Sequence, residues 1–394
     1  MSAVNSWNAR ITGLGSVSPP GPCRGLIGAR AVNPRIYFED PVRGGRRAFM
    51  VEPFRPGDVV PGLKTRRLDR LSVWSLVAAH LALQDARIDL EKEDRSRFAV
   101  VFGTGYGCIE LTEAYFKTVA GFGYAKADPI VFPETLDNSP ASHVARVLGL
   151  RGPNITLSCR GVSGESALIQ GASLLGSGEA DRVLVLAGDT LSRPLYEWFD
   201  AARVLSDACY ADRPEPASPL ARGTGFVPGE GLAGVVLESG SGYADRGVHA
   251  YCSLKSGCMG SNPGIAPSAW GECPDLTAVL IRSALGDDTP ADVKLVVGAA
   301  NGSARLDLQE AEAIRRVFGP RGGVTITAPK TRIGEFDGNA VLRLIMALPG
   351  SGNAAARVEF EGVPGDGRLL MLLGASAGGS RAVLCFSLPG SQRP

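Results

Sequence analysis

The sequence predicts an α/β protein made of two copies of one unit, with helices covering both faces of its sheets. Segments such as 98–107 and 182–189 are apolar at nearly every position, which is typical of strands buried on both faces. Several of these runs end in Gly/Ser turns that lead into stretches with helical periodicity. The same order of patterns returns after residue 249, which indicates a duplicated unit.

The first half is predicted to occupy residues 1–240. A stretch rich in Pro, Gly and Arg, up to about residue 62, is expected to be irregular and to add no core element, and residues 207–224 are expected to form a loop. The other expected elements are, in order, a strand at 9–18, a buried helix at 68–86, a strand at 98–107, a helix at 109–120, an irregular connection into a short helix at 131–150, a strand, turn and helix at 152–178, a strand at 182–189, and a Gly-rich turn and strand at 225–239.

The second half is predicted to occupy residues 245–394 and to repeat the first. Its expected elements are a strand and loop at 249–262, a helix at 273–287, a strand at 294–303, a strand, turn and helix at 324–352, and two strands around a Gly/Ser turn at 368–388. Each element follows the order of its counterpart in the first half.

Composition excludes several classes of function. The chain has 41 basic and 40 acidic residues among 394, so its charge favours neither nucleic acid nor a membrane surface as a partner. Its eight cysteines are scattered and form no CxxC pair, which argues against a disulfide scaffold and against a metal site. The N-terminus has no apolar signal core, and no run approaches 18 apolar residues, so we expect a cytoplasmic protein.

The strand, turn and helix at 152–178 are the candidate site for chemistry. A turn of this kind exposes a residue at a helix N-terminus, where backbone N–H groups can activate a nucleophile or hold an oxyanion. Cys159 is a possible nucleophile, but the strand side of such a turn usually faces the core, so a buried structural thiol is expected. Ser163 is a weaker candidate, because its surroundings do not match G-x-S-x-G and no histidine is positioned to serve it.

Several motifs, taken together and in order, give the chain a family resemblance. They are ITGLGSVSPPG near the start, RRLDRLS at 66–72, GLRGPNIT at 149–156, RVLS at 203–206, GFVPGEGLAGVVLE at 225–238, EAEAIRRVFG at 310–319 and GASAGGSRA at 374–382. With them the chain resembles the β-ketoacyl-ACP synthases of the thiolase superfamily. The resemblance implies a thiolase-like α/β fold, a duplicated five-layer αβαβα arrangement, and it implies no cofactor.

The family's catalytic positions are where this chain departs from the pattern. The motif that carries the nucleophilic cysteine corresponds to residues 159–164 and places Gly161 at the nucleophile. The first family histidine corresponds to Asn301 or Ala299, and the second corresponds to Glu335; neither replacement supplies the neutral imidazole donor. Lys330 alone is retained, so no catalytic residue is expected.

The resemblance therefore extends to the chain length factors, the catalytically silent ketosynthase homologues of type II polyketide and aryl polyene systems. It implies two partners, an active ketosynthase in a heterodimer and an acyl carrier protein bearing a phosphopantetheine-bound chain. Residues 131–144 match the family segment at the dimer interface and acyl tunnel, with Phe132, Leu136 and Asn138 as candidates for contact with the chain or the partner. Chain length factors often carry glutamine at the nucleophile position, so Gly161 departs from them too.

The vestigial pocket is expected to include Cys159, Arg160, Ser163, Lys330 and Glu335. A carboxylate buried there needs a cation, so we expect Glu335 to pair with Arg160, Lys330 or Arg332. Two other functions stay open at this point. One is an acyltransferase or thioesterase that uses Cys159 or Ser163, and the other is a homodimeric scaffold that binds an acyl ligand or the carrier protein.

Overall fold

The computed structural model describes residues 7–27, 32–41, 44–210, 225–240, 243–266, 269–271, 273–319, 324–351, 357–359 and 367–390. Of the expected loop at 207–224, residues 211–224 lie outside the described residues. In the described part, no helix is both long enough and apolar enough to cross a membrane.

The sheet of the first half has a characteristic strand order. Its strands are β1 (Ala9–Ser18), β5 (Phe98–Gly103), β6 (Asn154–Leu157), β7 (Arg182–Asp189) and β8 (Gly231–Glu238). They lie in the order β6-β5-β7-β8-β1, in which β5 is parallel to β6 and β7, whereas β8 is antiparallel to β7 and β1. The apolar strands β5, β7 and β8 are almost completely buried, as their sequences predict.

The second half repeats this topology strand for strand. Its strands are β9 (Cys252–Ser261), β10 (Val293–Val297), β11 (Thr325–Thr327), β13 (Leu369–Ala375) and β14 (Ser380–Ser387), in the order β11-β10-β13-β14-β9. The pairing directions are also the same. The short strand β12 (Arg357–Glu359) adds to the outer edge at β11. The predicted repeat is therefore confirmed in its topology.

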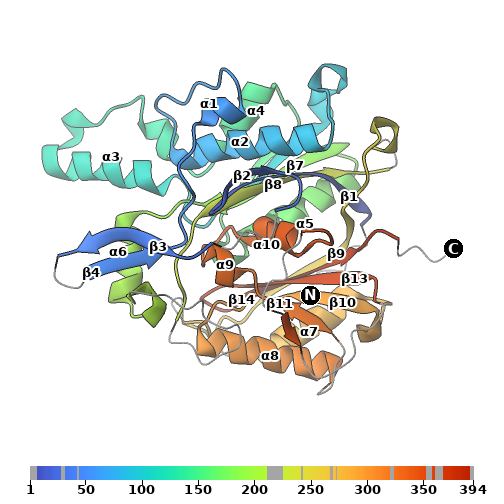
Figure 1. The fold of residues 1–394 in the computed structure, drawn as a ribbon. Coiled ribbons are helices and arrows are strands. Elements are labelled where there is room, and N and C mark those ends of the chain that lie inside the picture. Colours follow the sequence, from blue (N-terminus) through green and yellow to red (C-terminus); the bar gives the residue numbers. More distant parts are fainter. Residues whose placement is uncertain are drawn as a thin grey trace.

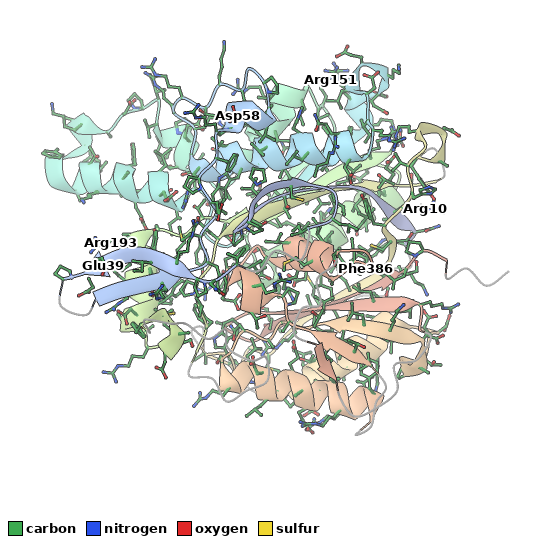
Figure 2. All side chains as sticks on the ribbon, viewed as in Figure 1. Arg10, Glu39, Asp58, Arg151, Arg193 and Phe386 are labelled. Atoms are coloured by element: carbon green, nitrogen blue, oxygen red, sulfur yellow. The ribbon has the colours of Figure 1, made fainter. Side chains whose placement is uncertain are left out.

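Helix layers and the two sheets alternate, so the molecule has five layers (Figure 1). Helices α2 (Arg70–Asp85) and α4 (Ser139–Leu148) cover the outer face of the first sheet, and α7 (Pro274–Leu285) and α8 (Ala304–Phe318) cover that of the second. Between the sheets lie α5 (Ser163–Gly176) and α10 (Ala340–Ala347), whose side chains share the central core with both sheets. This is the thiolase-like, five-layer αβαβα arrangement that the resemblance implies. Phe386 of β14, labelled in Figure 2, is fully buried in that core.

The remaining helices are short or peripheral. Helices α1 (Pro56–Val59), α3 (Ile109–Phe122) and α6 (Arg193–Ala201) lie outside the five-layer core, and α3 projects to one side of the body (Figure 1). The single turn α9 (Lys330–Ile333) places Ile333 in the central core. Single turns of 3-10 helix are η1 (Leu90–Lys92), η2 (Arg95–Arg97), η3 (Tyr124–Lys126), η4 (Phe132–Thr135), η5 (Arg160–Val162), η6 (Asp207–Cys209), η7 (Ala244–Arg246) and η8 (Pro290–Asp292).

The expectation that the stretch up to residue 62 adds no core element is wrong. It forms β2 (Gly21–Arg24), which pairs with β1, and a separate hairpin of β3 (Arg35–Asp40) and β4 (Gly44–Ala48). The hairpin is anchored because Ala48 and Phe49 are buried with Tyr196 and Phe199 of α6. The arginines of this stretch conceal the pattern, since Arg46 itself is buried.

Candidate functional site

Gly161 lies where β6 gives way to α5, at a position closed to any side chain. It is buried within η5, and its backbone N–H donates a hydrogen bond to Ser376 Oγ at 3.3 Å. A Cβ atom placed on Gly161 would lie 2.6 Å from the carbonyl oxygen of Ala375 and 3.1 Å from Ser376 Cα. Both are backbone atoms that cannot rotate aside. The turn therefore keeps the form of a nucleophile turn without space for a nucleophile.

Glu335 is held by three donors in the buried region next to this turn. Its Oε2 accepts from Lys330 Nζ at 2.8 Å and from Asn301 Nδ2 at 2.6 Å, and its Oε1 accepts from Asn339 Nδ2 at 3.1 Å. Lys330 and Glu335 are only 2% and 7% exposed, so this ion pair is shielded from water. Of the three cations considered from the sequence, Lys330 is the one that pairs with this carboxylate.

Asn301, rather than Ala299, shares the site with Glu335. The side chain of Asn301 reaches the carboxylate of Glu335, whereas Ala299 contributes a backbone N–H that donates to Glu310 Oε2 at 2.7 Å. Asn301, about 30 residues before Lys330 and Glu335 in the sequence, is thus brought into one network with them. In that network the amides of Asn301 and Asn339 and the ammonium group of Lys330 are occupied by a single carboxylate.

The structure corrects the expectation for Cys159. Its thiol is exposed, not buried, because β6 is the outermost strand of its sheet and the residues that follow it emerge at the surface. Ser163 is fully buried, and its hydroxyl accepts from the backbone N–H of Cys159 at 2.9 Å. The same hydroxyl lies within donating distance of the carbonyl oxygens of Arg160, at 2.6 Å, and Thr104, at 2.9 Å. Ser163 therefore supports the turn and does not face a substrate.

A cavity of about 700 Å³ opens beside this network. Among the residues expected in the pocket, Arg160 and Glu335 line it; Lys330 lies behind Glu335, and Cys159 and Ser163 are not part of the lining. The apolar wall is aromatic, with Tyr106, Trp198, Phe199, Phe226 and Trp270. The polar side also includes Asp337 and Ser376.

Two aspartates near the cavity were not predicted from the sequence. Asp189, the last residue of β7, accepts from Thr104 Oγ1 at 2.5 Å and from the backbone N–H groups of Gly105, Tyr106 and Gly338 at 2.6–2.9 Å. Burial nevertheless raises its pKa to about 6. Burial also raises the pKa of Asp337 well above its usual value, and the charges of Asp189 and Glu335 add to this effect.

The proposed tunnel residues lie away from this cavity. Phe132 and Leu136 are 46% and 45% exposed, and Asn138 is also exposed, at η4 and the turn before α4. None of the three belongs to the cavity lining.

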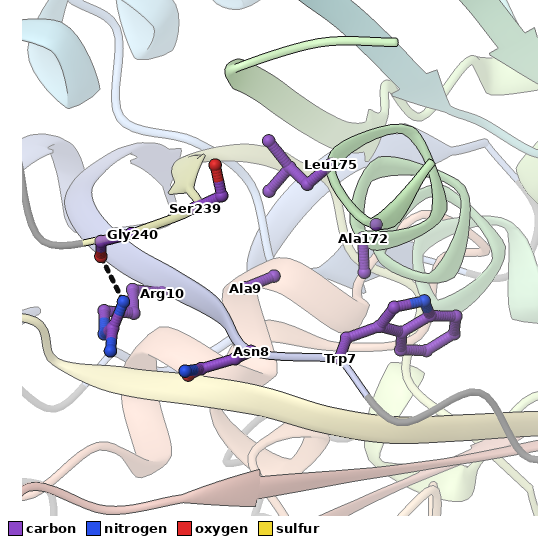
Figure 3. Close-up of a pocket in the computed structure, with 9 residues that line it drawn as sticks. Trp7, Asn8, Ala9, Arg10, Ala172, Leu175, Ser239 and Gly240 are labelled. Atoms are coloured by element: carbon purple, nitrogen blue, oxygen red, sulfur yellow. Dashed lines mark hydrogen bonds between the residues drawn. The ribbon is translucent and has the colours of Figure 1, made fainter. Parts of the chain in front are cut away.

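None of the three histidines lines this cavity, and His249 lines two other hollows. In the described part, His143 contacts Glu134 and Arg146, and His80 contacts Gln84. A hollow of about 410 Å³ lies between Trp7, Leu175 and Gly240 (Figure 3), with Arg10 as its one charged lining group. No group of three or more metal-binding side chains occurs among the residues that the structure describes.

Comparison with known proteins establishes the family. The model of the β-ketoacyl synthase N-terminal domain matches residues 29–242, and that of the C-terminal domain matches residues 267–348. The chain belongs to the β-ketoacyl synthase family.

Ketosynthases and their partner subunits are both found among its relatives. The chain is 26% identical over 343 residues to 3-oxoacyl-(acyl-carrier-protein) synthase 2 of Vibrio harveyi, covering 84% of this chain and 82% of that protein. It is 29% identical over 360 residues to the tetracenomycin polyketide synthase ketoacyl synthase beta subunit of Streptomyces glaucescens, covering 86% and 84%. Its structure superposes on the ishigamide ketosynthase/chain length factor with a TM-score of 0.81, at 20% identity, covering 98% and 100% of the two chains.

Proposed function

We propose that this chain is a non-catalytic ketosynthase-like subunit, a chain length factor, that pairs with an active β-ketoacyl synthase in polyketide or polyene biosynthesis. The observation that carries the proposal is the closed turn at Gly161. A ketosynthase that forms a thioester needs a nucleophilic side chain there. The backbone at Ala375 and Ser376 leaves no room for one.

The network around Glu335 supports the same conclusion. A decarboxylating condensation needs neutral donors that are free to stabilise an enolate as it forms. In this chain the amide of Asn301 and the ammonium group of Lys330 already donate to Glu335. An anionic intermediate at this point would meet a carboxylate instead of a donor.

A surface on the first half supports a protein partner. Large apolar side chains are exposed along α3, η3 and η4, with Phe122 at 75% and Tyr124 at 87% exposure; the others are Phe116, Ile130, Phe132 and Leu136. Exposed apolar side chains gathered in this way are typical of protein interfaces. The edge strand β6, with no further strand beyond it in the described sheet, lies in the same half. We assign Phe132, Leu136 and Asn138 to this interface and to the adjoining acyl tunnel.

Co-expression with an active ketosynthase tests the proposal. The two chains should purify as a 1:1 complex that extends an acyl chain on its carrier protein, and activity should be lost when this chain is omitted. Full activity of the ketosynthase alone would contradict the role proposed here. A stable homodimer of this chain that does not exchange with the ketosynthase would instead favour an acyl-binding or carrier-protein-binding scaffold.

The exposure of Cys159 favours one alternative enough to be tested. An accessible thiol could accept an acyl group, whereas the buried Ser163 could not without opening the turn. We expect no acyl transfer or thioester hydrolysis, because no described histidine contacts Cys159 to serve as its base. The rate of thiol release from an acyl thioester should therefore be the same with the wild-type chain and with Cys159→Ala, and a rate that falls in the variant would favour the thioesterase.

A further inference from the structure

Asp337 places a carboxyl group at the cavity. The proposed partner role does not use this group. It lies in the cavity lining, two residues after Glu335, and faces the backbone of Gly105. Among the described residues, no donor forms a hydrogen bond with its carboxyl group and no cation lies within ion-pair distance. Asp337 is half-buried at the cavity, where its carboxyl group is accessible to a ligand.

Around Asp337, carboxyl groups outnumber cationic groups. Asp189, at the end of β7, and Glu335 both act to raise the pKa of Asp337. The cations Lys330 and Arg160 act in the opposite direction but more weakly. Lys330 is already paired with Glu335. A ligand that brings a positive charge would relieve the repulsion among these carboxyl groups.

The aromatic wall of the cavity suits a ligand that carries a cationic group on an apolar body. Phe199 lies at its centre, with ring centroids 5.5 Å from Trp198, 5.2 Å from Phe226 and 6.4 Å from Tyr106. Aromatic faces attract ammonium groups and also pack against apolar ligands. A volume of about 700 Å³ falls within the range of small-molecule sites.

We propose that this cavity binds an organic cation, a primary ammonium group on an aromatic or apolar body, with the ammonium group at Asp337 and the body against Trp198 and Phe199. Bound there, the ammonium group donates to the carboxyl group of Asp337. The other titratable groups near Asp337 are Asp189, Glu335 and Tyr106. This inference is independent of the proposed partner role, because it requires only the chain itself.

Calorimetry with three probes that share a phenyl ring tests the site. Near neutral pH, 2-phenylethylammonium should bind at least about tenfold more tightly than 2-phenylethanol, and phenylacetate should bind most weakly.

Substitution of Asp337 distinguishes ligand binding at this site from non-specific hydrophobic binding. Asp337→Asn should lose the preference for the ammonium ligand, while its unfolding temperature at neutral pH does not fall. Asp275→Asn is the matched control and should bind as the wild type does, since that side chain is 89% exposed on the opposite outer layer. Equal binding of the alcohol and the ammonium ligand, an unchanged preference in Asp337→Asn, or no binding at about 10 mM ligand would each overturn the proposal.

Discussion

At the scale of single residues, Gly161 carries most of the functional argument. Gly161→Ala should lower the free energy of unfolding by about 1–3 kcal/mol, because the added methyl group meets the backbone of Ala375 and Ser376. Gly121→Ala is the control: a Cβ there has open space, so the same change should be neutral or slightly stabilising. Urea unfolding of the two variants measures the difference, and equal effects would show that the turn is not closed.

Asp337 gives a prediction about pH. Its pKa is raised in the folded state, so the folded protein holds this proton more tightly than the unfolded chain does. The stability from that proton is complete below about pH 4, the ordinary aspartate pKa, and is lost as the pH rises through the folded-state value. Asp337→Asn should therefore be more stable than the wild type near pH 8 and should lose less stability between pH 5 and pH 8.

Denaturant unfolding at these two pH values measures the effect. Asp275→Asn should follow the wild type, since its carboxyl group is 89% exposed and pairs with Arg316 at the surface. A pH dependence that is identical in wild type and Asp337→Asn would contradict the assignment of a raised pKa to this group.

The sequence identifies some site residues and misses others for physical reasons. Gly161, Lys330 and Glu335 fall within recognisable motifs, so their positions could be named in advance. Asp337 could not, because an Asp-Gly pair between a turn and a helix has the ordinary composition of a turn. Cys159 was misassigned because the sequence does not reveal that β6 is an edge strand.

At the scale of elements, the central helices α5 and α10 are joined by a buried ion pair. Glu165 and Arg343 are both fully buried, and the guanidinium group also donates to the carbonyl oxygens of Gly298 at 2.9 Å and Leu373 at 2.7 Å. Arg343→Met should lower the free energy of unfolding by about 3–5 kcal/mol, because it leaves the Glu165 carboxyl group buried without its cation.

The double variant Glu165→Leu/Arg343→Met provides the comparison. It should recover much of that loss, since two apolar side chains replace two charges in a dry core. Thermal and denaturant unfolding of the wild type, both single variants and the double variant measures the coupling. A double variant less stable than Arg343→Met would show that the pair is favourable in itself.

Strong apolar periodicity made most elements predictable, and its absence explains the main error. The strands β5, β7 and β13 are continuous apolar runs, so the sequence alone reveals them. The β3–β4 hairpin is rich in charged residues and is fixed by contacts with α6, more than 140 residues away in the sequence. Local patterns carry no information about such a contact.

At the scale of the whole molecule, the exposed apolar surface on α3, η3 and η4 predicts a partner. Phe132→Asp should weaken the complex with an active ketosynthase by at least about tenfold, because it places a charge in an apolar interface. Val279→Asp on α7 is the matched control, since Val279 is similarly exposed but lies on the opposite outer layer. Binding to ketosynthase immobilised on a surface should detect the difference in affinity between the two variants. Equal affinities would place the interface elsewhere.

The duplicated fold was predictable because the repeat is visible in the order of elements. The arrangement of the two sheets was not, because β1 joins them by pairing with β9, whose partner residues lie more than 240 positions away. This pairing joins the sheets of both halves into one strand path, with α5 and α10 packed between them. The cavity at Glu335 and Asp337 draws its lining from both halves. Its shape could not be foreseen from either half.

We propose that this chain takes part in condensation without carrying an acyl group. Intact-mass measurement of the reconstituted complex after incubation with an acylated carrier protein tests it most directly. We predict that the acyl mass increment appears on the active ketosynthase alone, while the mass of this chain is unchanged. An acyl increment on this chain, lost in Cys159→Ala or Ser163→Ala, would contradict the claim.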